Sequence, residues 1–364
     1  MRILLLLALC AFAQAAEPTV KTEIVARGLT IPWGLAFPPD GRILVTERPG
    51  TVRVVTKDGK LLKEPLHTFR EVAHTGEAGL MDIQLHPHYE RNKWIYFSHT
   101  YRQGRSMFVR VVRFRENDSG LVQRKLIIEG IPTARFHAGC RMGFGPDGKL
   151  YITTGDATQR KLAQELDSLA GKTLRLDDDG VVPKDNPFAG RKGARPEIWS
   201  YGHRNAQGLA WQPDTGRMFQ TEHGPSVFDG PSGGDEVNIV KKGDNLGWPL
   251  VSHAGTREGT VVPLLVFTPA VAPAGAVVYD GTLLKGVRGN LFFGCLRGQC
   301  LMRIELKGDK VVRKERWFEK KFGRIRDVAV GRDGLLYFTT SNRDGRARPK
   351  ADDDLIVRIV PARR

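Results

Sequence analysis

The chain has 364 residues, a formal net charge of +16 and four cysteines. This length suits one large β domain or two smaller ones, and the 41 glycines and 21 prolines are typical of many short strands and turns. The basic residues are dispersed and no DNA-binding motif is present, which argues against a nucleic-acid partner and favours a soluble basic surface or attraction to an anionic partner or cofactor.

The first 16 residues have the pattern of a secretory signal peptide. Arg2 precedes an apolar run at 3–12, and small residues at 13–15 form a cleavage signal. The run is too short to span a membrane. Lipid attachment at Cys10 is a weaker alternative, because the residue before it is bulkier than the small residue expected there. We therefore expect a mature chain of residues 17–364, periplasmic or secreted, without stable membrane insertion.

Three cysteines remain after cleavage at this site. In an oxidising compartment Cys295 and Cys300 could close a small loop, which would leave Cys140 free. The sequence alone does not settle the pairing. No CxxC zinc pattern is present.

Six short strands, each preceded by a turn, recur along the chain. Steps near 50 residues of turn-rich β sequence are typical of four-stranded propeller blades. The sequence therefore predicts an all-β, six-bladed β-propeller, in which the end runs Thr19–Leu29 and Asp354–Val360 pair in one blade. A β-sandwich is the alternative, but it does not predict the recurrence. The strand centres are 51, 56, 68, 73 and 45 residues apart, at Val45, Tyr96, Ile152, Gln220, Phe293 and Phe338.

The third and fourth steps are long, and we interpret the extra residues as insertions, Ala157–Pro196 and Pro225–Pro249. Loops at one end of a propeller channel commonly build the functional site. The site is therefore expected at these two insertions. Within the first, Lys161–Ala170 could form one or two helical turns.

Two groups of polar residues suggest a base and a flat ligand. His137 stands four residues before Arg141; a neutral imidazole can accept a proton, and a guanidinium can hold an anion. The stretch 200–208 contains a guanidinium, amides and glycines that permit close approach of a flat ligand. The alternatives are a packed or surface histidine and a polar loop between blades.

Two further groups suggest a cation and an anion. Gly224-Pro225, followed by Asp235-Glu236, offers oxygen ligands of the kind that calcium prefers, although no EF-hand loop is present. Arg324 and Arg326 share one face of a strand, and buried like charges require an anionic ligand or carboxylates. The alternative is a solvated edge with Asp327 in a salt bridge.

Together these groups predict a channel lined by Arg, His, Asn and Gln beside a hard-cation site. Such a channel suits a small, planar polyanion next to a proton-abstracting base. The sequence has no Rossmann glycine pattern or Walker loop and no nucleophile elbow.

In these motifs the chain resembles the soluble aldose sugar dehydrogenases and glucose dehydrogenases that use pyrroloquinoline quinone (PQQ), a family of six-bladed propellers. The resemblance runs from Ile31 to Val360. It rests on nine motifs in this order: Ile31–Phe37, Gly76–Met81, His137–Asp156, Gly171–Leu176, Asp185–Pro187, Tyr201–Gly208, Gly224-Pro225 with Asp235-Glu236, Gly243–Pro249 and Gly323–Asp327.

The resemblance implies oxidation of aldoses at C1 to lactones, with hydride passing to PQQ and electrons then leaving to an external acceptor, a cytochrome or a quinone. His137 would be the general base and Asp156 would orient it. The cofactor contacts would come from Arg204 and Asn205 near the reacting carbonyls and from Arg324 and Arg326 at the carboxylates.

The resemblance also implies a substrate or cofactor contact for Gln159 and a place near the sugar or the base for Asp235. Backbone carbonyls of Gly224 and Pro225 would hold the calcium that polarises PQQ. Glu236 would join a second, structural calcium site.

Three positions depart from the pattern of the family. Glu77, a predicted substrate contact, stands where some members have Gln. Arg297 stands where a cofactor-binding Lys is common, which keeps the charge but changes the geometry. Thr268 replaces an aromatic that covers the cofactor in the glucose enzymes, which favours a more open, broad-specificity aldose site. Two other functions remain open: a non-catalytic extracellular binding protein, and a calcium-dependent lactonase.

Overall fold

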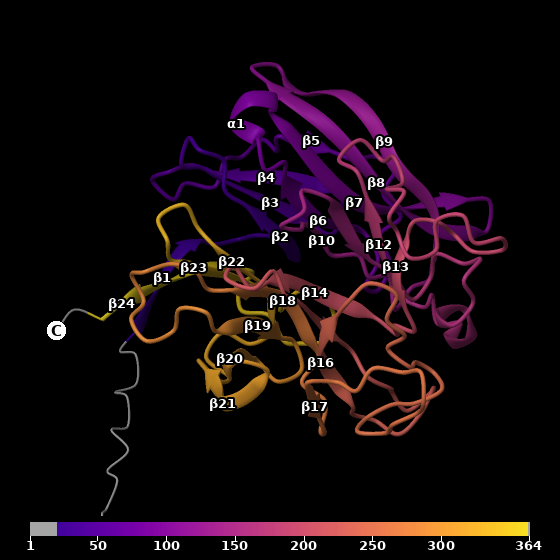
Figure 1. Cartoon of the computed structure of the whole chain (residues 1–364). Helices are drawn as coiled ribbons and strands as arrows, with labels where there is room; N and C mark the ends of the chain where they lie inside the picture. Colours follow the sequence, from indigo (N-terminus) through magenta and orange to yellow (C-terminus); the bar gives the residue numbers. More distant parts are fainter. Residues whose placement is uncertain (1–19, 363–364) are drawn as a thin grey trace, which may run out of the picture.

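The structure is a computed structural model that describes residues 20–362, and its regular secondary structure is almost entirely β-strand (Figure 1). The predicted signal peptide, residues 1–16, lies outside the described residues. Within residues 20–362, no helix is both long and apolar enough to cross a membrane.

The strands form six four-stranded antiparallel sheets, which confirms the predicted six-bladed propeller. The innermost strands of neighbouring blades contact one another around a closed ring. From the innermost strand outward, the first three blades are β2 (Pro32–Ala36), β3 (Ile43–Glu47), β4 (Thr51–Val55) and β5 (His67–Thr68); β6 (Leu80–Leu85), β7 (Trp94–Gln103), β8 (Ser106–Asn117) and β9 (Gly120–Thr133); and β10 (Met142–Phe144), β11 (Leu150–Thr153), β12 (Lys172–Leu176) and β13 (Ile198–Tyr201).

The other three blades follow the same plan, and two short helices lie in loops, α1 (Tyr89–Asn92) and the 3-10 helix η1 (Arg160–Ala163). The blades are β14 (Ala206–Trp211), β15 (Met218–Glu222), β16 (Asp235–Val240) and β17 (Leu265–Phe267); β18 (Pro273–Val278), β19 (Leu291–Cys295), β20 (Cys300–Lys307) and β21 (Lys310–Trp317); and β22 (Ile325–Val330), β23 (Leu336–Thr340), β24 (Ile356–Pro361) and β1 (Val20–Ala26).

The two ends of the chain close the ring, as predicted. Strand β1 is the outer strand of the last blade and pairs with β24, with Val20 opposite Pro361 and Ile24 opposite Val357. Because β1 and β24 pair in one sheet, the last blade has four strands, and it joins the first and last segments of the propeller.

All six predicted strand centres fall on the second strand of their blades, β3, β7, β11, β15, β19 and β23. The turns that lead into these strands have a common local chemistry. Gly148 and Gly334 both have φ of +73°, which only glycine adopts readily. The aspartates before them, Asp147 and Asp333, each accept a hydrogen bond from a tyrosine hydroxyl on the following strand.

The insertions were predicted too long, because each contains a blade strand. Residues 157–196 include β12, and residues 225–249 include β16. The predicted helical turns at Lys161–Ala170 reduce to η1. Lys172, which is fully buried, fastens this loop: its Nζ donates to the carbonyls of Leu162, Ala163 and Ala170.

The three described cysteines are buried free thiols. Cys295 and Cys300 are directly opposite each other in the β19–β20 pair. The predicted disulfide is therefore absent from this structure, although the two residues are neighbours, and Cys140 is free as predicted.

The channel along the propeller axis is blocked part-way by a buried ion cluster. Arg141 Nη1 lies 2.8 Å from Asp82 Oδ1, and its Nη2 lies 3.0 Å from Asp327 Oδ1. Its guanidinium also lies over the Trp33 ring, 4.2 Å from the centroid. Burial raises the pKa of Asp327 to about 6, against the lowering effect of Arg141. Arg141 thus binds carboxylates of the protein and is not placed to hold a ligand anion.

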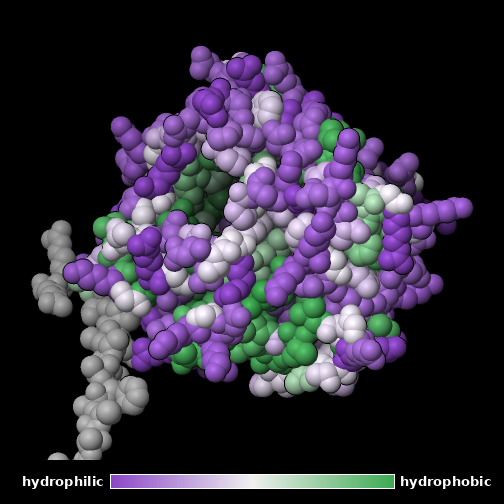
Figure 2. Space-filling view, in the orientation of Figure 1, coloured by the Kyte–Doolittle hydropathy of each residue, from purple (hydrophilic) through white to green (hydrophobic). Residues whose placement is uncertain are grey.

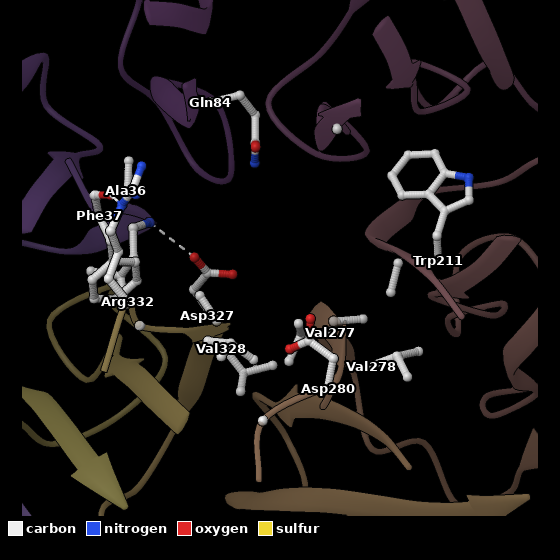
Figure 3. Close-up of a pocket in the computed structure, with 18 of the residues that line it drawn as sticks. Ala36, Phe37, Gln84, Trp211, Val277, Val278, Asp280, Asp327, Val328 and Arg332 are labelled. Atoms are coloured by element: carbon white, nitrogen blue, oxygen red, sulfur yellow. Dashed lines mark hydrogen bonds between the residues drawn. The ribbon is translucent and has the colours of Figure 1, made fainter. Parts of the chain in front are cut away.

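A cavity of about 930 Å³ lies on one side of this cluster, where the innermost strands end. Figure 3 shows Asp327 in this cavity, where its Oδ2 accepts a hydrogen bond from the backbone N–H of Leu35 at 3.0 Å. The walls of the cavity are mixed, with apolar side chains such as Phe37, Trp211 and Val277 beside polar ones such as Gln84 and Asp280. In the space-filling view the surface is mostly hydrophilic, and a hollow lined partly by hydrophobic residues opens in it (Figure 2).

Candidate active site

A second pocket, of about 530 Å³, lies at the opposite end of the channel, where the innermost strands begin. Most of the residues that the sequence singled out line it together. They come from the segments that lead into β6, β10, β14 and β22, from the loop after β15, from the start of β16 and from the turn after β19: Glu77, His137, Arg204, Gly224, Pro225, Asp235, Arg297 and Arg324.

His137 and Asp156 form a buried pair at this pocket. The imidazole Nδ1 lies 2.7 Å from Asp156 Oδ1. Asp156 Oδ2 accepts a hydrogen bond from Trp248 Nε1 at 2.8 Å, and its Oδ1 also accepts from the backbone N–H of Thr158. With Nδ1–H donated to the carboxylate, Nε2 is the ring nitrogen left to accept a proton.

The backbone at His137 is held in an unusual conformation. Its φ is +57°, a region that non-glycine residues seldom adopt. Its backbone N–H donates to Glu77 Oε2 at 3.1 Å, and the Phe228 ring stacks against the imidazole with centroids 5.8 Å apart. Such strain is typical of functional sites, where surrounding contacts fix the conformation.

Glu77 links the histidine to Asn205. Asn205 Nδ2 donates to Glu77 Oε2 at 3.3 Å, and Asn205 Oδ1 accepts from the backbone N–H of Gly139. Burial alone would raise the pKa of Glu77, but nearby basic groups, first His223 and then Arg346, lower it to about 2. Glu77 is therefore a carboxylate at neutral pH, fixed beside the candidate base.

Arg204 is held by the loop after β15. Its Nε pairs with Asp229 Oδ2 at 2.9 Å, and its other nitrogens donate to the carbonyl of His223 and to Ser226 Oγ. Sequence reasoning missed Asp229, because nothing in its local sequence marks it. The loop thus positions the guanidinium at the pocket wall.

Arg324 lines the pocket, and two further buried guanidiniums, Arg326 and Arg48, lie close enough for the charges to affect one another; among the described residues, only Arg324 of the three forms an ion pair. Arg324 pairs with Asp344 at 2.7 Å. Within residues 20–362, Arg326 and Arg48 form no ion pair; Arg326 donates to Gln207 Oε1, and Arg48 donates to His74 Nε2. The Nε of Arg326 is buried without a hydrogen-bond partner.

The electrostatics of this arginine group favour an anionic ligand. Burial is the main effect that lowers the pKa of both Arg326 and Arg48; the charges of Asp344 and Glu77 oppose this lowering in part, and the neighbouring guanidiniums add to it. A planar polycarboxylate would supply the missing charge through charge-assisted hydrogen bonds. Arg48 was missed from the sequence, although it directly follows the predicted strand at 41–47.

The backbone at Gly224 lies in close contact with the backbone of Gly234. A Cβ on Gly224 would lie 2.2 Å from the carbonyl oxygen of Gly234, so only glycine fits. The carboxylate of Asp235 accepts from the backbone N–H groups of Gly224, Val271 and Ala272. Because both carboxylate oxygens of Asp235 accept these hydrogen bonds, they hold the backbone of this wall in place. A cation bound here would therefore be held mainly by backbone carbonyls. Over the described range, 20–362, the structure has no cluster of three or more metal-ligating side chains.

Three predicted positions lie elsewhere. Gln159 lines an adjacent groove instead of this pocket. Thr268 is outside the pocket lining, and its Oγ1 accepts from the backbone N–H of Gly234. Glu236 lies behind the pocket, directly opposite Glu222 in the β15–β16 pair.

Glu236 leads to a pH-dependent stability prediction. Burial, and then the charge of Glu222, raise the pKa of Glu236 from 4.5 to about 8. Between these pH values the native protein binds a proton that the unfolded chain has released, so this group makes stability fall as the pH rises. We expect Glu236→Gln apoprotein to melt at a higher temperature than wild type at pH 8.5, and with a shallower decline from pH 5.

The measurement is thermal unfolding of metal-free apoprotein across this pH range. The exposed Glu258→Gln is the matched control. Identical pH profiles for wild type and Glu236→Gln would contradict the prediction.

Comparison with known proteins identifies the family to which this site belongs. The family model for Glucose / Sorbosone dehydrogenase matches residues 29–356. The chain belongs to the glucose/sorbosone dehydrogenase family. This membership confirms the resemblance found in the sequence and the predicted oxidoreductase class.

Individual members of the glucose/sorbosone dehydrogenase family match over nearly the whole chain. Aldose sugar dehydrogenase YliI of Escherichia coli (strain K12) is 35% identical over 350 residues, which cover 91% of this chain and 92% of the relative. An oxidoreductase of Thermus thermophilus that is named as a glucose dehydrogenase has a crystal structure with a TM-score of 0.87 and 42% identity, covering 94% of this chain and all of that one. The PQQ-bound aldose sugar dehydrogenase of Streptomyces coelicolor has a TM-score of 0.81 and 33% identity, covering 94% and 98%.

Proposed function

We propose that this protein is a PQQ- and calcium-dependent aldose dehydrogenase that oxidises sugars at C1 to lactones. The observation that carries the proposal is the buried, unbalanced arginine group of Arg48, Arg324 and Arg326 beside the His137–Asp156 pair. A site for a planar tricarboxylate next to a proton acceptor is what such oxidation needs.

The bound quinone, polarised by calcium, would supply the hydride acceptor. The residues of this chain would take up the proton and hold the reacting groups in place. Nε2 of His137 takes the proton from the C1 hydroxyl of the sugar. Without this transfer, hydride loss from C1 would leave a positively charged, protonated carbonyl, so removal of the proton makes hydride loss easier. Asp156 keeps the imidazole in the required tautomer and orientation.

The remaining residues would bind and position the cofactor, the sugar and the calcium. Arg324, Arg326 and Arg48 would hold the cofactor carboxylates, with Arg297 at the pocket wall. Arg204 and Asn205 would lie near the reacting carbonyls, and Glu77 would contact the sugar. Carbonyls of Gly224 and Pro225 would hold the calcium, while Glu236 with Glu222 offers a separate carboxylate pair for a structural ion.

The proposal extends to the cellular setting. The mature chain, residues 17–364, would act as one catalytic domain in the periplasm or outside the cell after removal of residues 1–16. Electrons would leave to an external cytochrome or quinone. A lactonase would need several carboxylates converging on one metal, and a pure binding module would not need an ordered base beside unbalanced arginines.

Dye-linked oxidation of a panel of aldoses by purified apoprotein tests the proposal. We expect activity only when both PQQ and calcium are added, and loss of activity after exhaustive chelation of calcium. Absence of both aldose oxidation and PQQ binding by titration would contradict it and favour a binding module. Lactone hydrolysis without PQQ would favour the lactonase.

A further inference from the structure

A second, strongly basic groove lies beside the active-site pocket. Its volume is about 430 Å³, and no acidic residue lines it. Three arginines contribute to it, Arg102, Arg105 and Arg135, all of them exposed. Within residues 20–362, none of the three forms an ion pair, whereas the neighbouring Arg110 lies 3.8 Å from Glu129. The groove therefore concentrates uncompensated positive charge.

Two of the groove arginines lie at the tip of a long, regularly paired β-hairpin. The second blade has the longest strands among the described residues: β7 has 10, β8 has 12 and β9 has 14. The β7–β8 ladder continues to Gln103 opposite Ser106, so the hairpin closes on the two residues Gly104 and Arg105. Gly104 has φ of +59°, as the first central position of such a tight turn requires. Because β7 and β8 are long, their hairpin ends at the rim of the groove and places Arg102 and Arg105 there.

The groove is adjacent to the candidate base. Three chain segments each contribute one residue to the groove and one to the active site: Thr75 and Glu77, Arg135 and His137, and Gln159 and Asp156. Arg135 and His137 are two residues apart, so their Cα atoms lie within about 7 Å of each other. The guanidinium of Arg135 also lies 5.3 Å from the centroid of Phe136, which lines the active-site pocket. A sugar joined to one bound at His137 would therefore reach the groove.

We infer that the groove binds the anionic, non-reducing end of an acidic oligosaccharide whose reducing sugar is oxidised at His137. This inference rests on the proposed aldose oxidation and adds a substrate class to it. Guanidinium groups bind carboxylates in two-point, charge-assisted geometry, which suits uronic acid residues. The position of Gln159 in this groove gives it a role with the distal sugar instead of with the reacting centre.

A matched pair of disaccharides tests the inference: cellobiose, and the analogue in which glucuronic acid replaces the non-reducing glucose. For the loaded wild-type enzyme we expect kcat/KM for the acidic sugar to be about two- to fivefold higher, the effect of roughly one exposed ion pair. We expect the double variant Arg102→Gln/Arg105→Gln to bring the ratio close to one. High salt should also reduce the ratio in wild type, because it screens exposed charges.

The control variant is Arg288→Gln, which should keep the wild-type ratio; Arg288 is an exposed arginine of the fifth blade that forms no ion pair with any described residue, 20–362. Calorimetric titration of the apoprotein with the acidic disaccharide provides a readout without turnover. If no aldose is oxidised but this binding is present and weakened in the double variant, the proposed function fails and the groove assignment stands.

Two outcomes overturn the inference while leaving aldose oxidation intact. The first is equal kcat/KM for the two disaccharides in wild type. The second is an unchanged sugar ratio in the double variant together with a raised KM for an anionic acceptor such as ferricyanide, which would assign the arginines to the electron acceptor.

Discussion

Replacement of His137 by alanine is expected to lower turnover of the PQQ- and calcium-loaded protein by about 10²- to 10⁴-fold. The His137 imidazole has a free ring nitrogen that can accept the C1 hydroxyl proton, since its other nitrogen is bonded to Asp156. Cofactor binding should be largely retained, because the buried arginines are on other segments. The measurement is turnover per bound PQQ, with PQQ quantified by titration.

Two companion variants sharpen this test. Asp156→Asn should also lower turnover per bound cofactor, since the amide cannot hold the same tautomer as the carboxylate does. His88→Ala is the control, because His88 is exposed and lies outside the pocket. A His137→Ala protein that binds PQQ poorly but turns over normally per bound PQQ would overturn the assigned role.

Replacement of Arg326 by methionine is expected to have opposite effects on the apoprotein and on the cofactor complex. PQQ affinity should fall by about 100-fold or more, because a buried charge-assisted contact is lost. The apoprotein should become more stable by about 1–3 kcal/mol, because a buried guanidinium whose desolvation is not offset by a direct ion pair among the described residues is replaced by an apolar side chain of similar length.

Arg324→Met is the matched contrast. Arg324 pairs with Asp344, and both side chains are buried. Its removal should also weaken PQQ binding, but it leaves the Asp344 carboxylate unpaired and should destabilise the apoprotein by about 3–5 kcal/mol. Urea unfolding of the apoproteins and PQQ titration measure both effects. Equal destabilisation by the two substitutions, or wild-type PQQ affinity in Arg326→Met, would contradict the proposed division between an unpaired and a paired arginine.

The blade count could be predicted because its signals are local. Each turn and the strand that follows it lie within about a dozen residues, and backbone preferences of Asp-Gly turns and strand alternation act over that range. Spacing between strands then counts the blades. The boundaries of the insertions were wrong for the same reason, since β12 and β16 are short strands within turn-rich segments and lack a distinctive signal.

The candidate site was predicted in part. His137, Arg204 and Arg324 stood out as residue types within motifs, and the structure brings them to one pocket. The residues that decide their environment come from distant segments: Trp248 is 92 residues from Asp156, and Gln207 is 119 residues from Arg326. Local sequence carries no signal for such contacts.

The sequence by itself therefore determined the repeat, the number of blades and the types of reactive side chain available to the protein. Only the tertiary structure decided which charges are balanced. In the described residues, Arg141 pairs with Asp82 and Asp327, Arg326 and Arg48 form no ion pair, and Gln159 lies in a separate groove. The physical reason is that burial and charge neutralisation depend on distance in space, and ring closure brings residues from all six blades to one axis.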